Sequence, residues 1–112
     1  MPETTRIKNM PFSEAVSLAD LVEYQSGQVV SRTIAQNPAM SMTLFALDAG
    51  ESISTHITAG DALVYVLDGE VLLEIGDKKV PTAAGQATVM PADIPHALYA
   101  EQRFKMLLVV VK

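Results

Sequence analysis

The chain has no cysteine among its 112 residues, and aromatic residues make up only 5% of it. Without cysteine, the protein forms no disulfide, holds no metal through thiolates and uses no cysteine nucleophile. Because aromatic side chains are scarce, the core must be built from Val, Leu, Ile, Ala and Met. Histidine is scarce as well: His56 and His96 are the only two, so any imidazole chemistry depends on this pair.

Basic side chains are outnumbered, since eight lysines and arginines stand against 13 aspartates and glutamates and give a net charge of −5. Such a chain lacks a basic stripe that could neutralise phosphates, so we expect no binding to nucleic acid and none to an anionic membrane. The longest apolar run, Met106–Val111, is too short to cross a bilayer. Residues 1–5 lack the basic head and apolar core of a signal peptide. We therefore expect a soluble cytoplasmic protein.

Residues 1–112 are expected to form one domain, because this length is near the commonest domain size. Residues 1–27 form an N-terminal arm in this interpretation, and residues 28–112 form the rest. Within the arm, Ser17-Leu18-Ala19-Asp20 has the form of a capping box and predicts a short helical turn that ends by Gly27. The apolar side of this turn, which should pack over a sheet, consists of Leu18, Leu21 and Val22.

After the arm, short segments rich in β-branched and apolar residues alternate with turn signals. Asp68-Gly69 predicts a two-residue hairpin turn, and Gly76-Asp77 predicts a second. Pro81 cannot donate a ladder hydrogen bond, which restricts its strand to an edge or a bulge. About nine short strands separated by turns indicate an all-β antiparallel barrel or sandwich. The expected strands are Val29–Ile34, Met40–Leu47, Ser52–Thr58, Ala62–Leu67, Glu70–Ile75, Lys78–Ala83, Gln86–Met90, His96–Ala100 and Phe104–Val111.

Alternation along the strands predicts which side chains face the core. The inward set is Ala62, Val64, Val66, Val71, Leu73, Ile75, Phe104, Met106, Leu108 and Val110. His56 and Thr58 share one parity and should point the same way as each other. Two outward rows are also apolar, and they consist of Leu63, Tyr65, Leu67 and Leu72 and of Leu107, Val109 and Val111. Outward apolar rows need cover, so we expect the arm or a second subunit to lie on them and favour a homodimer.

The spacing around the first histidine resembles the first motif of the cupin family of small β-barrels. That motif runs Gly, five residues, His, one residue, His, three or four residues, Glu, six residues, Gly. Gly50, His56 and Gly69 stand at matching positions. Thr58 replaces the second histidine of the motif, and Ala62 replaces its glutamate.

The second cupin motif runs Gly, five residues, Pro, one residue, Gly, two residues, His, three residues, Asn. Gly85, Pro91 and His96 match it, whereas Asp93 and Ala100 replace the later glycine and the asparagine. The resemblance spans roughly residues 40–111. It implies the cupin double-stranded β-helix, a jelly-roll barrel, with the short N-terminal segment packed on it.

In metal-binding cupins, the motif histidines and the glutamate hold one divalent ion. The resemblance therefore implies that His56 and His96 occupy two of four ligand positions, with Zn, Ni, Fe or Mn as candidate ions. Zinc normally takes four ligands, and catalytic sites usually keep three from the protein, so water or a bound ligand would complete the shell. The alternative is a metal-free polar pocket in which the histidines pair with each other, with Thr58 or with ordered water. In either case, the predicted ligand pocket is lined by His56, Thr58, Ala62, Met90, His96 and Met106.

Three functions follow from these residues. The first is a binding barrel for a small molecule or a loosely held divalent metal, since a pocket needs only a few oriented polar groups in an apolar wall. The second is a metal-dependent enzyme similar to cupin dioxygenases or isomerases, with His56 and His96 as ligands. The third is a dimeric interaction protein whose barrel interior is only a core.

Overall fold

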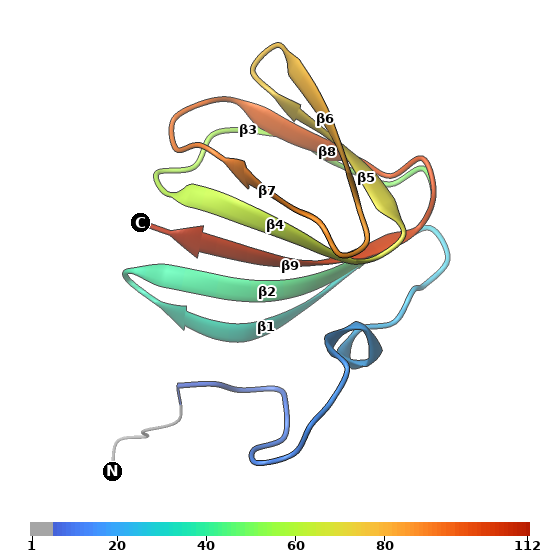
Figure 1. The fold of residues 1–112 in the computed structure, drawn as a ribbon, viewed down its shortest axis with the longest axis vertical. Coiled ribbons are helices and arrows are strands. Elements are labelled where there is room, and N and C mark those ends of the chain that lie inside the picture. Colours follow the sequence, from blue (N-terminus) through green and yellow to red (C-terminus); the bar gives the residue numbers. More distant parts are fainter. Residues whose placement is uncertain (1–5) are drawn as a thin grey trace.

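The computed structural model describes residues 6–112 and consists of two antiparallel sheets that face each other as a flattened barrel, with the N-terminal arm beside it (Figure 1). No helix in this part of the chain is long and apolar enough to cross a membrane. The elements are the 3₁₀-helix η1 (Leu18–Leu21) and the strands β1 (Val29–Asn37), β2 (Met40–Leu47), β3 (Ser52–His56), β4 (Asp61–Asp68), β5 (Glu70–Ile75), β6 (Lys78–Ala83), β7 (Ala87–Met90), β8 (His96–Tyr99) and β9 (Phe104–Val111).

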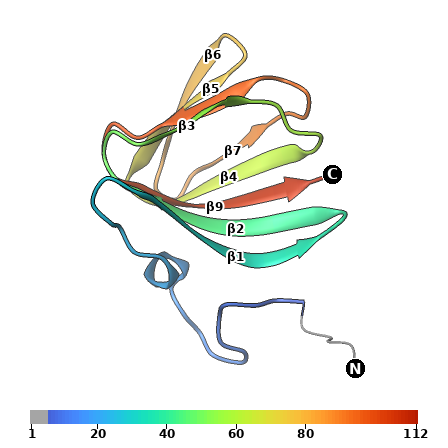
Figure 2. The ribbon, with the colours of Figure 1, turned by 180° about the vertical axis from the view of Figure 1, so that it is seen from behind.

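The two sheets have five and four strands. The order is β1-β2-β9-β4-β7 in the first and β3-β8-β5-β6 in the second. The chain crosses from one sheet to the other between β2 and β3, β3 and β4, β4 and β5, β6 and β7, β7 and β8, and β8 and β9 (Figures 1 and 2). This is the jelly-roll barrel that the resemblance to cupins implies. The nine predicted strands are all present, and five of them differ from the predicted bounds only at their ends.

The predicted hairpin at Asp68-Gly69 is wrong. β4 pairs with β7 and β9, whereas β5 pairs with β6 and β8, so Gly69 carries the chain from one sheet to the other. Turn chemistry reports the local backbone, and Gly69 has the left-handed φ of 77° that such a turn requires. It does not report which strands pair, because that depends on contacts distant in sequence. The hairpin at Gly76-Asp77 is confirmed, with Ile75 opposite Lys78.

The predicted core face is confirmed even though the hairpin is not. Parity within a strand is a local property, so it holds whichever strand lies next to it. Pro81 lies on β6, which is an edge strand as predicted. The buried cluster between the sheets contains Leu47, Ala62, Val64, Val66, Val71, Leu73, Met90, Leu98, Ala100, Phe104 and Met106.

A second buried cluster lies on the outer face of the five-stranded sheet, beneath the arm. It contains Val22, Ile34, Leu44 and Ala46, with Leu18, Leu21, Leu67 and Leu107 packed against it. The arm therefore covers part of the outward apolar rows, as the sequence predicts. The capping box is wrong in detail: Ser17 makes no side-chain cap bond, and η1 ends well before Gly27.

Tyr24 fastens the end of the arm to the barrel. Its hydroxyl donates to Asp68 Oδ2 at 2.5 Å, and the Arg103 guanidinium lies 4.4 Å from the centre of its ring. Burial and the bond to Asp68 raise the pKa of Tyr24 far above its usual value, so the hydroxyl keeps its proton. Lys105 Nζ donates to the carbonyl of Ala19 and ties η1 to β9.

Candidate functional site

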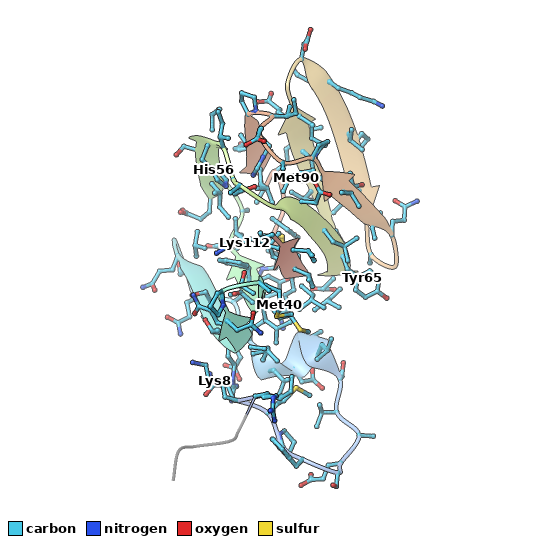
Figure 3. The ribbon with its side chains drawn as sticks, turned by 90° about the vertical axis from the view of Figure 1, so that its left-hand side faces the viewer. Lys8, Met40, His56, Tyr65, Met90 and Lys112 are labelled. Carbon is cyan, nitrogen blue, oxygen red and sulfur yellow. The ribbon has the colours of Figure 1, made fainter. Side chains whose placement is uncertain are left out.

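The two histidines lie directly opposite each other on β3 and β8. The antiparallel register pairs His56 with His96, so both side chains leave the same face of the four-stranded sheet. Their ring centroids are 4.3 Å apart, with an angle of 69° between the ring planes. Residues forty positions apart in the sequence thus form one imidazole pair near the end of the barrel where Figure 3 labels His56.

A β-bulge in β3 brings His56 to the barrel side. Ile53 pairs with Leu98 and His56 with His96, so β3 has one residue more than β8 between these two pairs. In a regular strand, residues three positions apart point to opposite faces. The extra residue restores a common face, so His56 lies beside His96 while Ile53 packs on the core. No pattern in the sequence indicates this bulge.

Each imidazole is oriented by a backbone carbonyl of its own chain segment. His56 Nδ1 lies 2.9 Å from the Ser54 oxygen, and His96 Nδ1 lies 3.1 Å from the Ile94 oxygen. A carbonyl oxygen only accepts, so each Nδ1 carries the proton and donates. In the neutral ring, Nε2 then holds a free lone pair, and neither Nε2 has a hydrogen-bond partner in residues 6–112.

The two rings differ in burial. His96 is 1% exposed, whereas His56 is exposed at the edge of the sheet. Burial lowers the pKa of His96 below its usual value of 6.5, and the nearby His56 lowers it further, while the bond to the Ile94 carbonyl acts in the opposite direction. His96 is therefore mainly neutral at pH 7 and retains the Nε2 lone pair.

The loop before His96 is held by three hydrogen bonds to its backbone, two from backbone groups and one from a side chain. The amide of Asp93 donates to the Thr58 carbonyl at 3.0 Å, and that of Gly76 donates to the Pro95 carbonyl at 2.8 Å. Asp61 Oδ1 accepts from the amide of Ala92 at 2.8 Å. These contacts fix the loop that presents the Ile94 carbonyl to His96. The sequence analysis missed the roles of Ser54 and Ile94, because both act through a backbone oxygen that every residue carries.

The family model for the cupin domain matches residues 43–112, which is most of the chain. The chain belongs to the cupin family. This confirms the resemblance seen in the two histidine motifs, and the barrel described above is the fold of that family.

Two solved structures are similar over nearly the whole chain. A conserved protein of unknown function from Streptococcus pyogenes is 40% identical, with 99% of this chain and 97% of that chain covered and a TM-score of 0.95. A cupin superfamily protein from Desulfitobacterium hafniense is 34% identical, with 96% and 98% covered and a TM-score of 0.91. A curated relative, an uncharacterized protein from Streptomyces coelicolor, is 32% identical over 60 residues, which are 54% of this cupin and 57% of the relative. A salicylate 1,2-dioxygenase from Pseudoaminobacter salicylatoxidans is 17% identical with a TM-score of 0.69 and shows the fold alone.

Three of the six predicted pocket residues, Ala62, Met90 and Met106, belong to the buried core between the sheets. Ala62 and Met90 are 1% exposed and face each other on β4 and β7, and Met106 is fully buried. These three side chains are enclosed in the core, so a ligand that touched them would have to displace neighbouring core side chains. Thr58 lies beyond the end of β3, where its hydroxyl donates to the Gly60 carbonyl at 2.8 Å.

The donor atoms near the pair suit an open site with two protein ligands. Residues 6–112 contain no group of three or more His, Cys, Asp or Glu side chains placed to hold a metal ion. Ala62, at the glutamate position of the cupin motif, has no donor atom. The two Nε2 atoms nevertheless have the chemistry of ligands, because a metal-binding histidine usually donates its other ring N–H to a carbonyl or carboxylate. The residues present therefore fit an ion whose remaining positions are filled by water or a small ligand.

Proposed function

We propose that this cupin binds a divalent first-row transition ion through Nε2 of His56 and His96, with water or a small organic molecule completing the shell. One observation carries the proposal: both Nδ1 atoms donate to backbone carbonyls, which leaves both Nε2 lone pairs free on neighbouring rings. A buried imidazole that only packs would also need its Nδ1 bond, so it is the two free Nε2 lone pairs on adjacent rings that favour a ligand. The low pKa of His96 supports the same function, because a neutral imidazole is the form that binds metal.

The chemistry of the pair sets which ions suit it and how tightly they bind. Imidazole nitrogen suits Zn, Ni and Fe, whereas Mn prefers oxygen ligands. Two neutral ligands supply no negative charge, so we expect the ion to exchange more readily than at a site with a carboxylate. Such an ion would leave several coordination positions open and could polarise an oxygen of a small ligand as a Lewis acid. His56, which is exposed, gives that ligand a way in.

The proposal is tested by calorimetric titration of untagged protein with Zn²⁺ or Ni²⁺, and by metal analysis after dialysis. We expect one ion per chain in the wild type, and a loss of affinity of about tenfold or more in His56→Ala and in His96→Ala. Thr55→Ala is the matched control, because Thr55 is exposed on the same strand next to His56 and should bind as the wild type does. Wild-type protein that binds neither ion, or loading that is unchanged in both histidine variants, would refute the proposal.

The organic ligand is tested separately by thermal shift of metal-loaded protein against small carboxylates, diols and phenols. We expect a compound that fills the open coordination positions to raise the melting temperature of the loaded wild type. The same compound should raise the melting temperature of loaded Thr55→Ala as much as that of the wild type. It should not change the melting temperature of His56→Ala. Stabilisation that persists in both histidine variants would place the ligand elsewhere on the molecule.

A further inference from the structure

A mainly apolar row of side chains crosses the outer face of the four-stranded sheet. The register places Tyr99 between Ser52 and Leu72, and Pro81 lies opposite Leu72 on the next strand. Tyr99 is 45% exposed, and Pro81 is exposed as well. The arm lies on the other side of the molecule, beside the five-stranded sheet (Figures 1 and 2), so within residues 6–112 this row stays uncovered.

Two hollows lie on either side of the row. One has a volume of about 250 Å³ and borders Tyr99. Its other polar lining residues are Ser52, Ser54, Thr55 and Glu74. The second has a volume of about 130 Å³ and borders Leu72 and Pro81. Its polar lining residues are Glu70, Glu101 and Gln102. Each hollow therefore offers carboxylate oxygens next to an apolar edge.

The spacing of the two hollows is set by β5. Glu70 and Glu74 lie on this strand with Leu72 midway between them, and the shared parity of the three sends their side chains to the same face. Four residues of strand span on the order of 13 Å. The outer groove, as we name it, has two acidic ends and an apolar middle, and it consists of Glu70, Leu72, Glu74, Tyr99 and Glu101.

The carboxylates of the outer groove have weak partners or none. Glu74 lies 4.0 Å from Lys79 Nζ with both side chains exposed, and an exposed ion pair contributes less than about 1 kcal/mol. Neither the Glu70 nor the Glu101 carboxylate makes a hydrogen bond or an ion pair within residues 6–112. The register of β5 and β8 brings these two carboxylates to the same hollow, where like charges repel. The outer groove therefore favours a cation.

The apolar middle of the outer groove selects among cations. A linear polyamine carries ammonium groups separated by methylene chains, and an ammonium group in each hollow forms charge-assisted hydrogen bonds with the carboxylates there. The methylenes between them bury apolar surface on Leu72 and Tyr99, and an ammonium group near the face of the Tyr99 ring gains further attraction. A hydrated metal ion uses the carboxylates but gains nothing from the apolar middle. The net charge of −5 attracts a polycation from a distance.

We propose that the outer groove binds a linear polyamine, with one terminal ammonium group at Glu74 and the other at Glu70 and Glu101. This site is separate from the histidine pair and does not rest on its binding a metal. Tyr99 and His96 are three positions apart on β8, so their side chains leave opposite faces of the sheet. His96 is accordingly 1% exposed and Tyr99 45%.

The test is a titration of the full, metal-free chain at fixed ionic strength, followed by two-dimensional NMR. Two diamines of equal charge serve as probes: putrescine, and the longer α,ω-diaminooctane, which reaches from one hollow to the other. We expect diaminooctane to bind about tenfold more tightly than putrescine, because it engages both acidic ends and the apolar middle. The amide signals that shift should belong to β5 and β8. Equal affinities for the two diamines, or shifts confined to other strands, would overturn the proposal.

Substitutions separate the outer groove from the net charge of the protein. Glu74→Gln should remove the advantage of diaminooctane over putrescine, because it leaves one acidic end. Tyr99→Ala should weaken the binding of diaminooctane about threefold or more. Glu23→Gln is the matched control, because it removes the same charge from an exposed position of the arm and should bind both diamines as the wild type does.

The NMR spectrum of each variant also reports whether it is folded. Glu74 and Glu23 are exposed, so both glutamine variants should give the spectrum of a folded barrel and decide the outcome if Tyr99→Ala does not. Loss of affinity that is equal in Glu74→Gln and Glu23→Gln would contradict the proposal, because binding would then follow net charge alone.

Discussion

His56 and His96 touch each other yet have different surroundings. His96 is 1% exposed, so water does not solvate its protonated form. His56, in contrast, lies at the surface. Each ring is oriented by the carbonyl two residues before it. Because the orienting groups are backbone atoms, substitutions at Ser54 or Ile94 should leave both bonds in place. The imidazoles themselves are the residues that mutation can probe.

The lowered pKa of His96 predicts that stability falls as the pH decreases. The unfolded chain binds a proton near pH 6.5, but the folded chain binds it only at a lower pH. The unfolded state therefore holds more protons in this window, and the free energy of unfolding decreases as the pH falls through 6.5. Urea unfolding of metal-free protein at a series of pH values from about 7.5 to about 5 measures this slope.

His96→Gln is the comparison for this measurement, because glutamine does not titrate. The variant should show a smaller loss of stability over the same pH range, and the difference between the two curves reports His96. Carboxylates titrate in both proteins, so their contributions to the pH dependence of the free energy of unfolding cancel in that difference. Parallel curves for wild type and His96→Gln would contradict the assigned shift.

At the scale of the element, strand identity was well predicted and strand pairing was not. Apolar alternation and turn residues located β2, β5, β6 and β9 with the bounds that the structure has. The passage from β4 to β5 was predicted as a hairpin, because Asp68-Gly69 has the local chemistry of one. In the barrel, β9 takes the place beside β4. That competition between distant strands is invisible in a short window of sequence.

Gly69 shows how closely this passage is packed. A Cβ at Gly69 would lie 2.4 Å from the Arg103 carbonyl oxygen, and the residue has a φ of 77°. We expect Gly69→Ala to destabilise the fold by about 3 kcal/mol, from the left-handed backbone and the clash together. Gly50→Ala is the matched control, because Gly50 has a φ of 87° with no atom within 4 Å of its Cβ position and should cost about 1 kcal/mol. Urea unfolding compares the two, and equal losses would show that the backbone alone matters.

At the scale of the whole molecule, the five-stranded sheet is buried on both faces near β2 and β9. The core between the sheets covers one face, and the arm covers the other around Leu44. The bond from Tyr24 to Asp68 and that from Lys105 to Ala19 join the arm to the barrel at its base. We therefore expect the arm from η1 onward to unfold together with the barrel.

Val22→Asp tests this coupling. Val22 is 3% exposed, so an aspartate there would bury an unpaired carboxylate and should lower the free energy of unfolding by about 3 kcal/mol or more. Gln25→Asp adds the same charge at an exposed position of the arm and should change stability little. Urea unfolding followed by circular dichroism measures both. A barrel that unfolds at the wild-type midpoint in Val22→Asp would show that the arm is not part of the cooperative unit.

The sequence by itself determined the fold class, the inward faces of β4, β5 and β9, and the family, because alternation, turn residues and motif spacing are local properties. The tertiary structure decided the rest: which strands pair, how the bulge before His56 turns that ring toward His96, and which carbonyls hold the two imidazoles. These depend on contacts between segments far apart in the chain and on backbone atoms common to all residues. Side-chain identity alone therefore does not predict these features.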